Sequence, residues 1–189
     1  MDPNVKLHRF RYHLARGFVK PGDVVIDLGC GQGYGSYLLA EVAKKVYAYD
    51  IDKTVVPEYE DATYSIEGNT SKVEFHLEDL EEVELPEVDV AVQLENLEHL
   101  YNPAEFVKKL KPKVKKFIIV SVPCGAEKLI EVDGDIQADK DSTHHSVFDT
   151  PEQLIDLFVD ENWKVFKSFR LGVTLICIFY NESIIKVGD

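Results

Sequence analysis

The fold is decided by the stretch Val24-Val25-Ile26-Asp27-Leu28-Gly29-Cys30-Gly31-Gln32-Gly33-Tyr34-Gly35. It opens with an apolar, β-branched run, which predicts a strand buried on both faces. Four glycines then alternate with other residues, and residues 34–42 carry apolar side chains at helical spacing. A strand, a glycine turn and a helix in this order bring backbone N–H groups and a helix N-terminus up to a ligand. The stretch therefore predicts a ligand-binding turn.

The spacing of the glycines argues against a dinucleotide. A dinucleotide fingerprint is G-x-G-x-x-G, so the third glycine would stand at position 34, where the chain has Tyr34. The pattern is instead D-x-G-x-G-x-G, with Asp27 as its acid. A carboxylate is unfavourable beside a pyrophosphate, but it suits a ligand that carries an ammonium group. An NAD-dependent oxidoreductase is therefore the weaker hypothesis.

Residues 25–36, VIDLGCGQGYGS, resemble the first motif of the class I S-adenosylmethionine (SAM)-dependent methyltransferases. The resemblance implies that the glycine turn faces the methionine part of SAM and that Asp27 orients its amino group. It also implies an enzyme with SAM as its cofactor. The full set of expected cofactor-binding residues is Asp27, Gly29, Cys30, Gly31, Gly33, Asp50, Ile51, Asp79, Leu80 and Glu95.

Acidic residues follow two further predicted strands. Asp50 ends the second strand, 21 positions after Gly29, where an acid can accept hydrogen bonds from two ribose hydroxyls. This position does not separate SAM from NAD, because both carry that ribose. The resemblance implies that Asp79, after the third strand, meets the adenine amino group and that Leu80 packs near the ring. Alternatively, Asp79 is one of many surface acids between residues 78 and 87.

A second motif lies at residues 88–100, VDVAVQLENLEHL, which are similar to the FDxVxxxEVLEH segment of many small-molecule methyltransferases. If these residues open a helix, Glu95, Glu98 and His99 share one face of it. His99 could remove a proton from the acceptor. The triplet, joined by a later histidine, could instead hold a divalent cation. A third alternative is that Glu98 and His99 only tie the turn together.

Residues 125–148 are expected to form a polar loop on the substrate side. Related methyltransferases often carry a histidine in a pattern like HxxxF before the following helix, and His145 or His144 matches it. We name His99 and His145 as the catalytic residues, although a solvated histidine pair is an alternative. Cys124 follows a strand, but a small buried cysteine is a simpler interpretation than a covalent thiolate.

Composition limits the class of partner. The chain has 189 residues and a formal net charge of -13, which opposes binding to a phosphate backbone. Its three cysteines have no metal-ligand spacing, and no apolar run reaches membrane-spanning length. We expect a cytoplasmic protein without a dedicated metal site; nothing in the sequence predicts its oligomeric state.

The predicted fold is a single α/β domain over residues 1–189, a Rossmann-like three-layer sandwich. Its seven-stranded sheet is mostly parallel and ends in an antiparallel pair. Residues 53–72 are expected to form only a short or broken helix, and residues 1–20 a covering helix with Tyr12 or His13 near the ligand. Helices are predicted at 5–20, 34–42, 103–110 and 151–162, and strands from residue 24 and at 45–49, 73–77, 88–94, 117–122, 163–169 and 173–180.

These observations predict a SAM-dependent methyltransferase that acts on an oxygen or nitrogen of a small-molecule acceptor. One alternative is a metal-assisted 2′-O-methyltransferase acting on an RNA 3′ end, with a divalent cation at Glu95, Glu98 and His99. Another is a SAM-binding protein without catalysis. The sequence does not name the acceptor, because specificity lies in loops.

Overall fold

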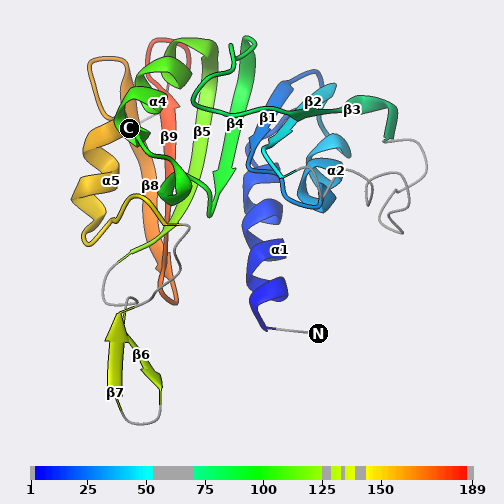
Figure 1. Cartoon of the computed structure of the whole chain (residues 1–189). Helices are drawn as coiled ribbons and strands as arrows, with labels where there is room; N and C mark the ends of the chain where they lie inside the picture. The colour runs from blue at the N-terminus through cyan, green and yellow to red at the C-terminus, as the bar shows by residue number, and fades with distance from the viewer. Residues whose placement is uncertain (1–2, 53–69, 125–128, 133–134, 139–143, 187–189) are drawn as a thin grey trace.

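A seven-stranded sheet forms the centre of the molecule (Figure 1). The computed structural model describes residues 3–52, 70–124, 129–132, 135–138 and 144–186. The strands lie in the order β3-β2-β1-β4-β5-β9-β8. Their bounds are β1 (Val24–Leu28), β2 (Lys45–Asp50), β3 (Val73–Leu77), β4 (Val88–Leu94), β5 (Val114–Pro123), β8 (Trp163–Leu171) and β9 (Thr174–Asn181).

The pairing confirms the predicted Rossmann-like sheet. Strands β1 to β5 pair in parallel, whereas β9 is antiparallel to both β5 and β8. The chain builds outward from β1 through β2 to β3, and then crosses back to add β4 on the other side of β1. Ligands of open α/β sheets bind at such a reversal, beyond the carboxyl ends of the strands. The end of β1 and the end of β4 are therefore the expected walls of the site.

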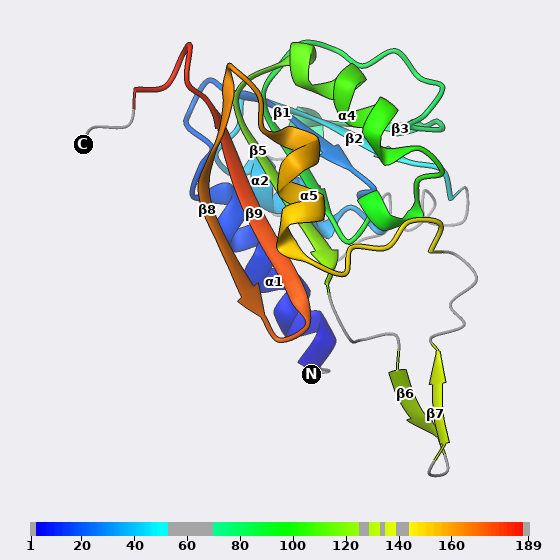
Figure 2. The ribbon, with the colours of Figure 1, turned by 90° about the vertical axis from the view of Figure 1, so that its left-hand side faces the viewer.

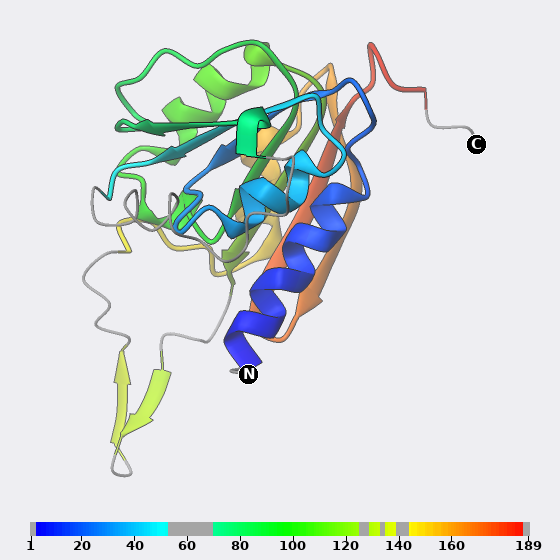
Figure 3. The ribbon, with the colours of Figure 1, turned by 90° about the vertical axis from the view of Figure 1, so that its right-hand side faces the viewer.

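Helices cover both faces of the sheet, and a hydrophobic core lies under each (Figures 2 and 3). Tyr12 of α1 and Leu39 of α2 pack with Val25 on one face. Phe106 of α4 and Phe158 of α5 belong to the core on the other face. The helices are α1 (Pro3–Arg16), α2 (Tyr34–Ala40), α4 (Pro103–Leu110) and α5 (Pro151–Phe158), with 3-10 turns η1 (Thr70–Lys72), η2 (Leu97–His99) and η3 (Lys111–Lys113).

Several predicted bounds are wrong. Helix α5 ends at Phe158 rather than 162, because the Asp160 carboxylate accepts hydrogen bonds from the backbone N–H groups of Asn162 and Trp163 and so stabilises a turn. Helices α1 and α2 end at 16 and 40 rather than 20 and 42. Strand β5 begins at Val114 rather than 117, since Val114 is buried and pairs with Val88.

Residues 125–148 are not wholly the loop that the sequence predicts. Strands β6 (Leu129–Val132) and β7 (Asp135–Ala138) form an antiparallel hairpin that makes a sheet of its own. The hairpin extends away from the rest of the molecule (Figures 1–3). The sequence predicts a short or broken helix at residues 53–72, of which 53–69 lie outside the described residues and 70–72 form η1. Among the helices that the structure describes, none is long and apolar enough to cross a membrane.

Candidate active site

The glycine turn is held against the end of β2. Gly29 and Cys30 both donate their backbone N–H to the Tyr49 carbonyl at 2.9 Å, and Gly31 N–H donates to the Asp50 carboxylate at 2.7 Å. A Cβ added to Gly29, whose φ is +74°, would lie 2.3 Å from the Asn96 side chain. A Cβ on Gly31 would meet no atom within 4 Å, so the space over the turn is open. The turn therefore forms a cradle that a ligand can approach.

Asp27, predicted to orient the amino group of SAM, is fully buried under α1. The Tyr12 hydroxyl donates to its carboxylate at 3.1 Å, and the Ser36 hydroxyl donates to it at 2.6 Å. Burial raises the pKa of Asp27 to about 7, although these two hydrogen bonds act in the opposite direction. Tyr12 fits here only because residue 35 is glycine, whose added Cβ would lie 2.1 Å from the tyrosine ring. Tyr12 thus covers Asp27, the acid that is predicted to contact the ligand.

The raised pKa of Asp27 predicts a pH-dependent stability. An acid whose pKa is higher in the folded state stabilises the fold fully below its unfolded pKa, and this contribution is lost as the pH rises through 7. From pH 4 to pH 8 the loss amounts to about 4 kcal/mol for a shift of this size. In Asp27→Asn we therefore expect the free energy of unfolding, measured by urea titration, to fall less over this range than in the wild type. The exposed Asp52→Asn serves as control, and equal pH slopes for Asp27→Asn and wild type would contradict the prediction.

A cavity of about 120 Å³ brings five predicted cofactor residues together with the predicted base. Its volume is below the range of about 300–1,000 Å³ typical of small-molecule sites, so these residues enclose only part of such a ligand. Four further lining residues were not among the predicted site residues: Glu81, Asn96, Leu100 and Tyr101. The last three lie within or just after the second motif, residues 88–100. The lining residues are Gly29, Asp50, Ile51, Asp79, Leu80, Glu81, Asn96, His99, Leu100 and Tyr101.

Two of the predicted acids at this cavity already accept backbone hydrogen bonds. The Asp50 carboxylate accepts from Gly31 and from Asp52, the latter at 2.9 Å. Asp79 accepts from Glu81 N–H at 2.9 Å. These contacts fix both carboxylates at the carboxyl ends of β2 and β3. The Cys30 side chain is buried against Ala48, and its thiol donates to the Gly31 carbonyl at 3.8 Å, so it stabilises the turn from below.

Glu95 does not share a helical face with Glu98 and His99. Its φ is +53°, a left-handed conformation that is uncommon for a residue with a side chain, and only the 3-10 turn η2 follows. Its carboxylate accepts from the Ser121 hydroxyl at 2.8 Å and from the Thr174 hydroxyl at 3.4 Å. Glu95 is therefore tied to β5 and β9, and it does not line the cavity.

Glu98, His99 and His144 form a compact group beside the cavity. One ligand atom from each lies within 4.8 Å of the others, and the two imidazole centroids are also 4.8 Å apart. Glu98 is buried, and its Oε2 has no hydrogen-bond partner among the described residues. Burial, followed by the charge of Glu95, raises the pKa of Glu98 to about 8. The group can therefore exchange protons, or hold a cation once Glu98 is ionised.

The chain places His144, not His145, against His99. His145 N–H and Ser146 N–H both donate to the Glu98 carbonyl at 2.9 Å, and the Ser146 hydroxyl donates to the Leu100 carbonyl at 3.1 Å. These bonds fasten residues 144–146 to η2. The His145 ring instead stacks on Tyr101, with ring centroids 3.8 Å apart. The two neighbouring histidines thus contact different partners.

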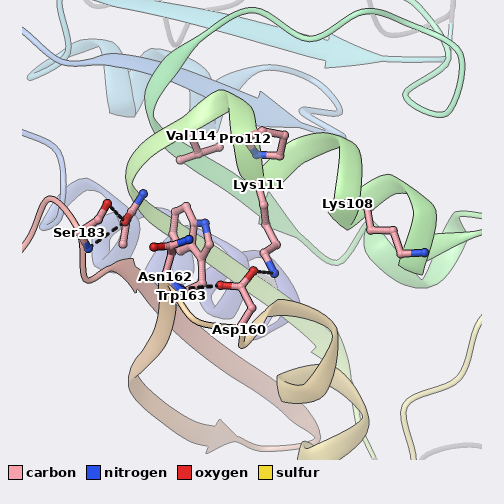
Figure 4. Close-up of a pocket in the computed structure, with 9 residues that line it drawn as sticks. Lys108, Lys111, Pro112, Val114, Asp160, Asn162, Trp163 and Ser183 are labelled. Atoms are coloured by element: carbon pink, nitrogen blue, oxygen red, sulfur yellow. Dashed lines mark hydrogen bonds and ion pairs between the residues drawn. The ribbon is translucent and has the colours of Figure 1, made fainter.

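A larger groove lies away from these residues (Figure 4). Its volume is about 450 Å³, and it includes Val114 at the start of β5, whereas the candidate site lies toward the other end of the strand. Lys111 pairs with Asp160, and the Ser183 hydroxyl donates to Asn181 at 2.6 Å. None of the predicted site residues lines this groove. The cavity at the glycine turn is therefore the candidate site.

The fold and this cavity are those of a Rossmann-like protein, and comparison with known proteins shows what part of the chain resembles. Residues 26–116 match the family model described as a methyltransferase domain. A probable SAM-dependent methyltransferase of Mycobacterium tuberculosis is 38% identical over 87 residues, which cover 45% of this chain and 29% of that protein. The matched sequence thus spans less than a third of that relative.

Solved structures share the fold at low sequence identity. The magnesium protoporphyrin IX methyltransferase of Synechocystis, solved with bound SAM, has a TM-score of 0.63 and 18% identity, covering 93% of this chain and 78% of that one. A small RNA methyltransferase has a TM-score of 0.71 and 18% identity, covering 93% of this chain and 25% of that one. Residues 26–116, just under half of the chain, therefore resemble the methyltransferase domains of SAM-dependent enzymes.

Proposed function

We propose that this chain is an enzyme that transfers a methyl group from SAM to an oxygen or nitrogen of a small molecule. The observation that carries the proposal is the cavity at the carboxyl ends of the strands, which joins Gly29, Asp50, Asp79 and His99. In this proposal Asp50 accepts hydrogen bonds from the ribose hydroxyls, and Asp79 accepts one from the adenine amino group. The open space over Gly31 gives the remainder of the cofactor an approach to the turn.

The proposed reaction needs mainly alignment and a proton acceptor. SAM, when bound, supplies a methyl group that a lone pair of the acceptor takes while the carbon–sulfur bond breaks and its electron pair stays on sulfur. The walls of the cavity position the acceptor and exclude water. A ring nitrogen of His99 takes the proton that a hydroxyl or amine acceptor loses, and passes it to water. We propose that His144 supports this role by its contact with His99, whereas the ring of His145 stacks on Tyr101.

The charge of the site favours a small acceptor over a nucleic acid. Three acidic residues line the cavity, and the whole chain carries a formal charge of -13. A phosphate backbone would be repelled by both.

We propose that the described elements belong to one domain over residues 1–189. Helix α1, near the start of the chain, packs on the sheet that carries the site, and β9, near its end, is one of the strands of that sheet.

Calorimetry with SAM, S-adenosylhomocysteine and NAD tests the cofactor. We expect saturable binding of the first two and none of NAD. Asp50→Ala should weaken binding of S-adenosylhomocysteine at least tenfold, because it removes the proposed ribose contact and the acceptor of Gly31 N–H. Asp52→Ala, which changes an exposed acid two residues away, should bind as the wild type does. Failure of both SAM and its product to bind would contradict the proposal, whereas binding without turnover on any acceptor would favour a non-catalytic SAM-binding protein.

A metal-assisted 2′-O-methyltransferase acting on an RNA 3′ end is the second candidate. The close approach of Glu98, His99 and His144 favours it, since carboxylate and imidazole together suit divalent transition metals. Glu95 argues against it, because the carboxylate that would complete the set is bonded to Ser121 and Thr174. Loss of methyl transfer on addition of EDTA, with recovery on adding Mn²⁺ or Mg²⁺, would select this candidate.

A further inference from the structure

A large aromatic side chain stands exposed at the edge of the candidate site. Tyr101 lines the cavity together with His99, yet it is 77% exposed. Tyrosine has an apolar ring and a polar hydroxyl, and aromatic side chains are common in the lining of ligand pockets and at interfaces. The tyrosine is available to a molecule that enters beside His99.

The backbone that carries Tyr101 is fixed. The Glu81 carboxylate accepts hydrogen bonds from Tyr101 N–H at 3.0 Å and from Asn102 N–H at 2.7 Å. Asn102 also accepts from Glu105 N–H and so begins helix α4. The ring is therefore presented from an anchored turn, which lowers the entropy cost of using it in binding.

His145 supports the tyrosine ring from a second anchored segment. The two rings are stacked, with centroids 3.8 Å apart and planes inclined by 19°. His145 N–H donates to the Glu98 carbonyl, so its backbone is tied to the same turn that carries His99. We call the stacked rings of Tyr101 and His145 the aromatic platform. It is exposed, it is carried by hydrogen-bonded backbone, and its tyrosine lines the same cavity as the proposed base.

The charges around the platform restrict what it can bind. Asp50, Asp79 and Glu81 line the cavity beside Tyr101, and no lysine or arginine lines it among the residues that the structure describes. An anionic ligand would be repelled by these carboxylates, whereas a neutral or cationic one would not. A planar ring gains from stacking on a tyrosine face, and a positive charge gains further from its π electrons.

We propose that the aromatic platform binds the ring of the methyl acceptor, and that this acceptor is a neutral or cationic planar aromatic compound carrying a hydroxyl or amine. The inference rests on the proposed methyl transfer and names its substrate class. Stacking on Tyr101 holds the ring beside His99, which takes the proton from the methylated group. The ring of His145 stacks on one face of Tyr101, and the other face is offered to the acceptor.

Three small probes test this assignment by ligand-observed NMR titration on the protein saturated with S-adenosylhomocysteine. Tyramine is aromatic and cationic, 4-hydroxyphenylacetate is its anionic counterpart, and 2-cyclohexylethylamine is cationic without an aromatic ring. We expect tyramine to bind most tightly. Tyr101→Leu should weaken tyramine about tenfold and the cyclohexyl probe, which loses only the contact of its charge with the ring, by about threefold or less, while Tyr101→Phe should keep tyramine binding within about twofold. His145→Ala should weaken tyramine by a smaller factor.

The outcomes separate this inference from the cofactor proposal. Equal binding of tyramine and the cyclohexyl probe, or no effect of Tyr101→Leu on tyramine, would overturn the platform even if S-adenosylhomocysteine binds. A loss of S-adenosylhomocysteine affinity in Tyr101→Leu, measured by calorimetry without any probe, would assign the platform to the adenine ring instead and would also overturn it. Failure of the wild type to bind S-adenosylhomocysteine would count against the proposed function. The melting temperature of each variant checks that it is folded.

Discussion

Replacing His99 with asparagine is expected to lower methyl transfer about 100-fold or more, while the affinity for S-adenosylhomocysteine stays within about threefold. The imidazole is the proposed acceptor of the proton that the substrate loses, and asparagine cannot accept a proton at neutral pH. His99 lines the cavity next to Asn96 and Leu100, so its replacement removes a base without removing the turn. Transfer is measured with methyl-labelled SAM and the acceptor found by screening.

His144→Asn provides the comparison for this variant, since its ring adjoins His99 but does not line the cavity. A smaller loss, about tenfold, is expected if His144 acts through His99. Activity of His99→Asn within tenfold of wild type would show that the acceptor loses its proton elsewhere. Equal losses in both variants, together with inhibition by EDTA, would favour a metal held by both histidines.

Gly29→Ala is expected to lower the free energy of unfolding by about 3 kcal/mol and the melting temperature by about 10 °C. Two costs combine. The left-handed backbone at φ +74° disfavours any side chain, by about 1–2 kcal/mol. The new Cβ would also lie 2.3 Å from the Asn96 amide, so the second motif must move away from the glycine turn. Because the cavity lies between these two segments, cofactor binding should be lost as well.

Gly31→Ala is the matched control for this prediction. Gly31 also has a positive φ, of +51°, but a Cβ there would meet no atom within 4 Å. Its cost should therefore be the backbone term alone, about 1–2 kcal/mol. Differential scanning calorimetry of the two variants separates the terms. Equal destabilisation by both substitutions would show that the contact with Asn96 relaxes without cost.

The sheet could be predicted because its signals are local. Strand β1, the glycine turn and α2 are adjacent in sequence, and the parallel order follows from alternating strands and helices. Asp50 was predicted from its place at the end of a strand and Asp79 from the resemblance; both line the cavity, since parallel strands end at one edge of the sheet. The site residues that directly follow a strand can therefore be predicted from the sequence.

The remaining features depend on contacts between distant segments. Glu95 takes a left-handed conformation and bonds to Ser121 and Thr174, which are 26 and 79 residues further along the chain. The burial of Asp27 depends on Tyr12, from the helix before β1. The sequence left His144 and His145 as alternatives because the choice between them depends on backbone bonds to the Glu98 carbonyl. Residue identity alone does not carry this information.

Those two backbone bonds also bear on how the protein could change over evolution. The Glu98 backbone carbonyl accepts from the N–H groups of His145 and Ser146. The position of His144 is therefore determined locally and not by the length of chain between Cys124 and His144. Insertions or deletions in that interval, which includes the β6–β7 hairpin, should leave the pair of imidazoles in place. Such a hairpin could therefore be lengthened or exchanged for another while His144 keeps its place beside His99.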